Sequence, residues 1–209
     1  MPAPRKFSRE QLQAAALALV DERGLGALTM RNLATELGTG AMTIYNYVDG
    51  REGLEELVTA AVMGETRWIE NAGDWPTQVR AVAEGMWQAI RAHPHAIPLI
   101  LTRRGSDIPT LAPAEALLRA LAGSGRSGIE LLVAFRAVSG FVTGFAQAEL
   151  TSPLAARTGE DRGAAAARVA ELPADRFPKL IEIAQAAAVS APEAEFRAGL
   201  EIVLAGLRS

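Results

Sequence analysis

The stretch LTMRNLATELGTGAMTIYNYVDGREGL, residues 28–54, decides how this chain folds. Its spacing predicts two short helices, over residues 30–37 and 41–48, joined by a turn that contains glycine. Thr29 is a suitable N-cap for the first helix, and Gly38 can supply the left-handed residue that ends it. The residues expected to pack inward and fix the angle between the two helices are Leu33, Ala34, Leu37, Ile44 and Val48.

A supporting helix is predicted ahead of this pair, over residues 9–23. Ser8 and Gln11 form a capping box at its start, and Gly24 ends it. Its apolar face consists of Leu12, Ala16, Leu19 and Val20. A supporting helix followed by two short helices is typical of a helix-turn-helix domain, in which the last helix enters the DNA major groove.

A longer helix is predicted after the third one, and it would link the reader to the rest of the chain. Asp49 and Glu52 resemble a second capping box at its start. Its apolar face continues through Leu54, Leu57 and Val58, and the helix is expected to extend to about Glu70.

The rest of the chain shows helical spacing and no strand-like alternation of useful length, so an all-α fold is predicted. Further helices are expected over residues 77–92, 96–103, 111–122, 127–150, 176–189 and 193–207. The stretch 151–175 mixes proline, glycine, charge and alanine and predicts a loop with one weak helix. We predict a helix-turn-helix DNA-binding domain over residues 1–54 and a helical ligand-binding and dimerisation domain over residues 55–209.

Composition excludes several classes of chemistry. The 209 residues are 49% hydrophobic, which is enough for a sizeable core, and contain no cysteine, so disulfides, thiolate zinc sites and thiol nucleophiles are excluded. The start MPAPRKFSRE is polar where a signal peptide needs an apolar core. The most apolar stretch, residues 131–145, is interrupted by Arg136 and falls short of a membrane span. A cytoplasmic protein with no membrane association is expected.

Net charge argues against binding nucleic acid through bulk positive charge, because the chain carries −3 and residues 1–55 are nearly balanced. DNA recognition must therefore rest on a few placed groups. Arg5, Lys6 and Arg9 form a short basic segment that could contact phosphate or the minor groove; the alternative is a solvated terminus.

Residues 28–54 resemble the N-terminal domain of the TetR family of regulators, most specifically in the LG turn and in the tyrosine near the end of the reading helix. The resemblance implies DNA-binding roles for individual positions. Arg31 would reach a base or a phosphate, and Ala41 and Met42 would offer apolar contact, for example to a thymine methyl. The remaining positions are Thr43, Asn46 and Tyr47 on the exposed side of the reading helix, and Tyr45 and Arg51 at phosphates.

Two details qualify this resemblance. Thr39 stands where the family usually has an apolar turn residue, although its methyl group can still pack. The alternative role for Tyr45 is that of a half-buried packing residue, and one side chain could serve both purposes.

Two later helices show heptad-like spacing that suits an interface between two subunits. The first steps through Leu131, Phe135, Val138, Val142, Phe145 and Glu149, with a second stripe of Ala137, Gly140, Gly144 and Ala148. The second steps through Phe196, Leu200, Val203 and Leu207, with Gly199, Ile202 and Gly206 beside them. A four-helix interface is one interpretation, and a purely intramolecular core is the other.

The same region is similar to the C-terminal domain of tetracycline-repressor-like members of the family, in the order Trp87, RAHP (91–94), LLRALAGSG (117–125), GFVTGF (140–145) and FRAGLEIVLAGL (196–207). The resemblance implies a homodimer that binds a pseudo-palindromic double-stranded DNA operator and an apolar or amphipathic small-molecule effector. It also implies a repressor that releases the operator when the effector binds, because the separation of the two readers changes. By reciprocity, DNA must weaken effector binding to the same degree.

Several residues could line an apolar effector cavity, but each could equally be ordinary core: Trp68, Met86, Trp87, Ile90, His93, Leu101, Phe135, Ser139 and Phe141. His93 and His95 have no further histidine or cysteine to complete a metal site, so neither a metal nor a cofactor is expected. An enzyme is disfavoured because no nucleophile–base set, phosphate-binding glycine loop or paired-carboxylate motif is present. A helical adaptor that binds only protein is disfavoured by the polar set around Arg31 and Asn46.

Overall fold

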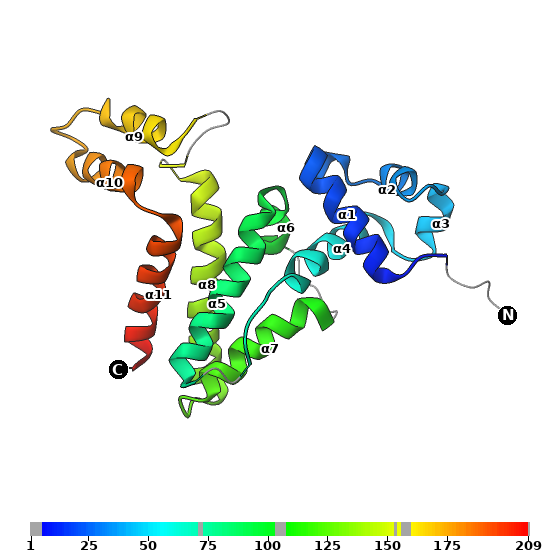
Figure 1. The fold of residues 1–209 in the computed structure, drawn as a ribbon, viewed down its shortest axis with the longest axis horizontal. Coiled ribbons are helices and arrows are strands. Elements are labelled where there is room, and N and C mark those ends of the chain that lie inside the picture. The colour runs from blue at the N-terminus through cyan, green and yellow to red at the C-terminus, as the bar shows by residue number, and fades with distance from the viewer. Residues whose placement is uncertain (1–5, 71–72, 103–107, 153, 156–159, 209) are drawn as a thin grey trace. The chain divides into compact units, whose positions relative to one another are not determined.

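The computed structural model describes residues 6–70, 73–102, 108–152, 154–155 and 160–208, and every regular element among them is helical (Figure 1). The all-α prediction is therefore confirmed. The first elements are α1 (Arg9–Arg23), the 3-10 turn η1 (Leu25–Ala27), α2 (Met30–Glu36), α3 (Ala41–Tyr45) and α4 (Gly50–Gly64). They are followed by α5 (Trp75–Ala92), η2 (Pro94–Ala96), α6 (Ile97–Thr102), α7 (Ile108–Ala122), α8 (Gly128–Thr151), α9 (Arg162–Ala170), α10 (Pro178–Val189) and α11 (Pro192–Arg208).

Local capping explains why the first helices begin and end where they do. At α1 the Ser8 hydroxyl accepts from the Gln11 amide at 3.2 Å, and the Gln11 side chain accepts from the Ser8 amide at 2.8 Å, as the capping box predicts. Gly24 ends the helix with φ +73°. At α2 the Thr29 hydroxyl accepts from the Asn32 amide at 3.1 Å. These two helices match their predicted ranges to within one residue.

The predictions for α3 and α4 were too long. The chain leaves regular helix after Tyr45, three residues early, and forms a turn through Asn46 and Tyr47. α4 ends at Gly64, not near Glu70, and the Asp49 side chain makes no capping hydrogen bond at its start. Glycine at the end of a helix was the available indication for this earlier end.

The reason for the early end of α4 is a close crossing with α5. A Cβ added at Gly85 on α5 would collide with the main-chain carbonyl oxygen of Arg67. The segment after α4 therefore lies against the backbone of α5, which only glycine at position 85 permits. This crossing fixes the path of residues 65–70.

Residues 1–131 form one compact unit. α4 packs against α1 and α7, and α7 also packs against α5. The largest side chain buried in this unit is Trp87, which is fully enclosed. The predicted functional boundary after residue 54 lies within α4, so the helix-turn-helix and the first body helices share one continuous core.

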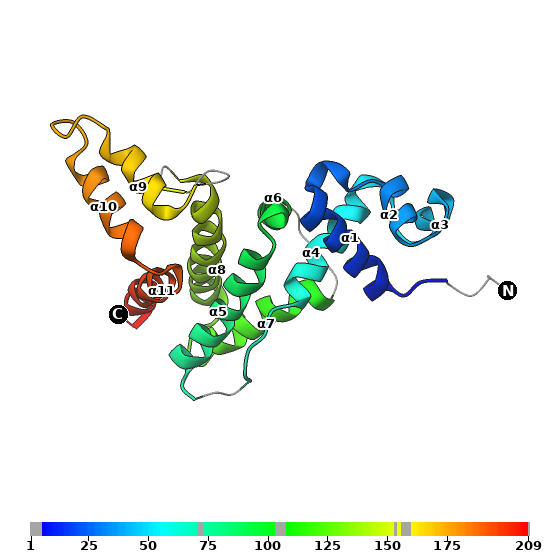
Figure 2. The ribbon, with the colours of Figure 1, turned by 45° about the horizontal axis from the view of Figure 1, so that its top comes forward.

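Residues 132–209 form the second unit, which contains most of α8 together with α9, α10 and α11. α9 and α10 lie side by side (Figures 1 and 2), and α9 is the one weak helix predicted within 151–175. α8 meets α11 through an aromatic cluster of Phe141, Phe145 and Phe196, with ring centroids 5.3–5.7 Å apart. A Cβ at Gly199 would lie 2.7 Å from Phe141, so glycine allows this close approach.

Within the second unit, one face of α8 is buried and another is exposed. Its buried stripe is Ala134, Val138, Val142 and Ala146. The predicted stripe of small residues, Ala137, Gly140, Gly144 and Ala148, is exposed on the single chain. α8 therefore has a flat, small-residue surface that this chain does not cover.

By length and composition, α8 could cross a membrane, contrary to the expectation that Arg136 makes its apolar stretch too short. One such helix is weak support for a membrane segment, because helices that pack in a protein core or interface pass the same test.

Candidate DNA-binding and ligand-binding sites

The α2–turn–α3 segment is held as a rigid platform by buried apolar residues and by main-chain hydrogen bonds. Leu33, Ala34, Ile44 and Val48 are buried as predicted, whereas Leu37 is half-buried. In the turn, Gly38 has φ +60°, and the Thr39 amide donates to the Ala34 carbonyl at 2.8 Å. The two helices are therefore fixed relative to each other through the turn.

Thr39 contributes more than a methyl group to this turn. Its hydroxyl donates to the Thr43 hydroxyl at 3.2 Å, which ties the turn to α3. The hydroxyl of Thr39 therefore has a polar partner, Thr43, four residues later in the sequence.

Four predicted DNA-contacting side chains lie on the solvent side of the platform. Arg31 and Asn46 are exposed, and Met42 and Tyr45 are 76% and 54% exposed. Within the described part of the chain, no hydrogen bond or ion pair engages the Arg31 guanidinium. The exposure of Tyr45 favours a contact role over the packing alternative. Ala41 and Thr43 are half-buried at the base of the same surface.

Tyr47 differs from the exposed position expected of it. Its hydroxyl accepts a hydrogen bond from the Phe7 amide at 2.9 Å, and the two rings lie 6.3 Å apart. Tyr47 therefore attaches the segment before α1 to the end of the reading helix. Lys6 and Arg9 on this segment are exposed, while Arg5 lies outside the described residues.

Arg51 also has an intramolecular role that sequence reasoning missed. Its guanidinium donates to the Leu28 carbonyl at 2.6 Å and to the Leu25 carbonyl at 3.1 Å, and it pairs with Glu55 at 2.6 Å. These bonds fasten η1 to α4 and satisfy carbonyls that precede α2. If Arg51 also contacts a DNA phosphate, its guanidinium must bind the phosphate in addition to these intramolecular partners.

His93, at the end of α5, joins three segments of the first unit. Its Nδ1 lies 2.8 Å from Asp21 of α1, and its Nε2 lies 2.9 Å from Glu65 after α4. Burial of the ring lowers the pKa of His93, but the hydrogen bonds that its ring donates to the Glu65 and Asp21 carboxylates, together with their negative charges, outweigh burial and hold the pKa above the ordinary value of 6.5. Both ring nitrogens are engaged, so His93 links α1 and the segment after α4 to the end of α5.

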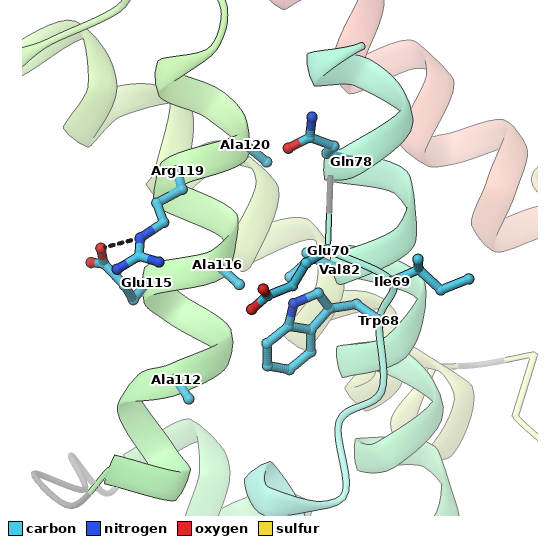
Figure 3. A pocket seen from close by; sticks show the side chains of 10 residues that line it. All are labelled: Trp68, Ile69, Glu70, Gln78, Val82, Ala112, Glu115, Ala116, Arg119 and Ala120. Atoms are coloured by element: carbon cyan, nitrogen blue, oxygen red, sulfur yellow. Dashed lines mark hydrogen bonds and ion pairs between the residues drawn. The ribbon is translucent and has the colours of Figure 1, made fainter. Parts of the chain in front are cut away.

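A pocket of about 310 Å3 lies between the segment after α4, α5 and α7 (Figure 3). The Trp68 indole points into it and faces a wall of small side chains on α7, Ala112, Ala116 and Ala120. Glu70 and Gln78 supply polar groups, and Glu115 pairs with Arg119 at 2.8 Å on one side. The apolar wall, aromatic ring and few polar groups are typical of a small-molecule site.

The other predicted effector residues are distributed differently. Met86, Trp87 and Ile90 are buried core residues of the first unit, and Leu101 is 39% exposed. Phe135, Ser139 and Phe141 lie on α8 in the second unit, where the Ser139 hydroxyl donates to the Phe135 carbonyl at 2.7 Å. Of the predicted set, only Trp68 lines the pocket of Figure 3. Among the described residues, no cluster of three or more histidine and acidic side chains has metal-binding geometry.

The comparisons with known proteins agree with the helix-turn-helix platform and the helical body. Residues 12–58 match the family profile described as bacterial regulatory proteins, tetR family. Residues 69–209 match the profile described as tetracyclin repressor-like, C-terminal domain. The chain therefore belongs to the TetR family of transcriptional regulators, a class of DNA-binding proteins and not of enzymes.

Two curated relatives share about a third of the aligned residues. An HTH-type transcriptional regulator from Saccharopolyspora erythraea is 31% identical over 144 residues, covering 68% of this chain and 61% of the relative. The HTH-type transcriptional repressor DrrR1 from Streptomyces coeruleorubidus is 32% identical over 143 residues, covering 65% and 51%. The chain thus spans between half and two thirds of the length of these relatives.

Solved structures extend the likeness to nearly the whole chain. The TetR family protein ActR from Streptomyces coelicolor, in complex with actinorhodin, is 28% identical with a TM-score of 0.76, covering 98% of this chain and 97% of that one. The apo form of ActR gives the same TM-score at 27% identity, covering 98% and 96%.

Proposed function

We propose that this protein is a ligand-responsive repressor that binds a pseudo-palindromic DNA operator as a homodimer and releases it when a small molecule binds the C-terminal helices. The observation that carries the proposal is the α2–α3 platform, which displays Arg31, without a partner in the described part of the chain, and Tyr45 and Asn46 beside it. A guanidinium held this way suits guanine O6 and N7 or a phosphate oxygen.

The residues of the platform divide into two roles. Arg31, Met42, Thr43 and Asn46 face bases or grooves, with Ala41 at the base of the surface, and Tyr45 donates to a phosphate. Tyr47 and Arg51 mainly hold the platform together, because their polar groups already have partners within the chain. Any phosphate contact they make is secondary to that role.

The effector is proposed to be a small amphipathic molecule. ActR binds actinorhodin, and its likeness to this chain covers the helical body. The Trp68 pocket supplies an aromatic face, an alanine wall and a few polar groups for such a molecule. Binding beside the segment that follows α4 would move α4 and the reader attached to it.

The homodimer is proposed to form through α8 and α11. The exposed Ala137, Gly140, Gly144 and Ala148 stripe allows two helices to approach closely, and Ile202 on α11 is 76% exposed on the single chain. Two copies would place their readers about one helical turn of DNA apart, roughly 34–36 Å.

A gel-shift assay with the DNA upstream of the gene tests this function. We expect a discrete protein–DNA complex at nanomolar protein concentration. An added effector should dissociate this complex and raise the melting temperature of the protein. Failure to bind that DNA more tightly than an unrelated duplex would contradict the proposal.

A further inference from the structure

A second hollow in the first unit, of about 470 Å3, lies between α1, the end of α4 and the beginning of α7. We call it the α1–α7 groove. Its apolar walls come from Leu17 of α1, Met63 of α4 and Ile108 of α7. It adjoins the pocket of Figure 3, with which it shares Trp68 and Ala112, but the two have different polar residues.

Two buried polar atoms on the wall of this groove have no hydrogen-bond partner among the described residues. Gln13 is 8% exposed and its Nε2 is unpartnered; Thr66 is 4% exposed and its Oγ1 is unpartnered. Unpartnered polar atoms cost free energy when buried, so nearly all such atoms in folded proteins are paired. Both side chains belong to the lining of the same groove, so a small rotation of each toward the hollow would let a bound molecule supply the missing partners.

The charged side chains that line the groove limit the kind of molecule that can bind there. Glu10 and Glu65 also line the groove, and the described part of its lining contains no lysine or arginine. Glu65 is paired with His93 on its other side. An anionic head group would therefore meet repulsion, whereas a neutral head group would not.

We propose that the α1–α7 groove binds a small neutral amphiphile that carries a secondary amide. The amide carbonyl accepts from the Gln13 side-chain NH2, and the amide N–H donates to the Thr66 hydroxyl. The hydrocarbon part lies against Leu17, Met63 and Ile108. Because the occupant contacts α1 of the reader and α7 of the body together, it would act on DNA affinity from outside the Trp68 pocket.

Binding of N-hexylacetamide to the full chain, measured by isothermal titration calorimetry in the absence of DNA, tests the site independently of the proposed function. Hexanoate serves as the anionic comparator with the same hydrocarbon chain. We expect saturable binding of one amide per chain at submillimolar concentration and binding of hexanoate at least tenfold weaker.

Four variants show where on the protein the probe binds. Gln13→Leu and Thr66→Val remove the unpartnered atoms, so each should weaken amide binding at least fivefold without lowering the melting temperature. Gln88→Leu, an exposed glutamine on α5, should change neither quantity. Ala116→Leu, which fills the pocket of Figure 3 only, should leave amide binding intact.

Each of the following results would overturn the proposal. These are no saturable amide binding, equal binding of hexanoate, or affinity unchanged by both Gln13→Leu and Thr66→Val. Loss of binding in Ala116→Leu would also overturn it, because the probe would then occupy the Trp68 pocket.

Discussion

Two arginines that the sequence assigns to DNA have different surroundings in the fold. Arg31 is exposed on α2 without an intramolecular partner among the described residues, whereas Arg51 spans from α4 to two carbonyls before α2. Helical spacing places a residue on a face, but it does not reveal partners 23 and 26 residues away. The exposure of Arg31 was accessible from sequence for this reason, whereas the hydrogen bonds of Arg51 to Leu25 and Leu28 were not.

Arg31→Ala should weaken specific DNA binding by about 1–3 kcal/mol, because a guanidinium contact to a base or phosphate is lost. The melting temperature should stay unchanged, since the side chain is exposed. Fluorescence anisotropy with operator DNA measures the first quantity and thermal unfolding the second. Equal affinities of the variant and the parent protein would remove Arg31 from the interface.

Arg51→Ala should instead lower the free energy of unfolding by about 1–2 kcal/mol, since charge-assisted bonds to Leu25 and Leu28 are lost at a half-exposed site. Urea unfolding measures this change. Arg51→Lys is the matched variant and should recover only part of the loss, because a lysine ammonium lacks the fork that reaches both carbonyls. Full stability in Arg51→Ala would show that the bracing is energetically unimportant.

His93 gives the first unit a pH-dependent stability. Its folded-state pKa is raised, so its contribution is fully present below about pH 6.5 and is lost as pH rises through the folded pKa. From about pH 6 to 8, the free energy of unfolding of the parent protein should fall more steeply than that of His93→Gln. His95 is present in both proteins, so the difference between their pH dependences reports on His93 alone. If the free energy of unfolding had the same pH dependence in both proteins, the proposed contribution of His93 would be refuted.

At the scale of elements, capping and apolar spacing predicted α1 and α2 well and the later helices approximately. Gly64 was a local indication of where α4 ends, but the crossing of Arg67 over Gly85 that follows is a tertiary contact, which no local pattern contains. The same crossing positions Trp68, the only predicted effector residue that lines the pocket of Figure 3. The polar lining of that pocket was not predicted, because it converges from three separate segments.

Gly85→Ala should push the Arg67 backbone away from α5 and lower the free energy of unfolding by about 1–3 kcal/mol, the usual cost of overpacking. Because Trp68 follows directly, its surroundings and the effector affinity should change as well. Chemical denaturation and tryptophan fluorescence measure these effects. Gly26→Ala is the control, since its Cβ would meet nothing within 4 Å; equal behaviour of the two variants would contradict the crossing.

At the scale of the molecule, the proposed function requires two chains, because a pseudo-palindromic site is read by a symmetric pair. The heptad-like spacing of α8 left two interpretations open, an interface or an internal core. In the fold, Ala134, Val138, Val142 and Ala146 are buried within the chain, while Ala137, Gly140, Gly144 and Ala148 are exposed. Sequence spacing found the small-residue stripe, but only Val138 and Val142 of the predicted apolar stripe belong to the buried one. Spacing could not say which face the chain itself covers.

Ile202→Arg should convert a dimer into a monomer at micromolar concentration, because a charge is placed in the proposed α8–α11 interface. Sedimentation velocity distinguishes the two species. Ile183→Arg on α10, where isoleucine is 51% exposed, is the matched control and should remain dimeric. A parent protein that sediments as a monomer would contradict the interface.

The central claim is that α2 and α3 read DNA sequence through a few side chains on a dimeric scaffold. Selection of binding sites from random duplex DNA tests it most directly. The account predicts an enriched pseudo-palindrome whose half-sites lie about one helical turn apart, and loss of that enrichment, or a changed half-site, with Arg31→Ala. No enriched sequence, or the same enrichment with Arg31→Ala, would contradict it.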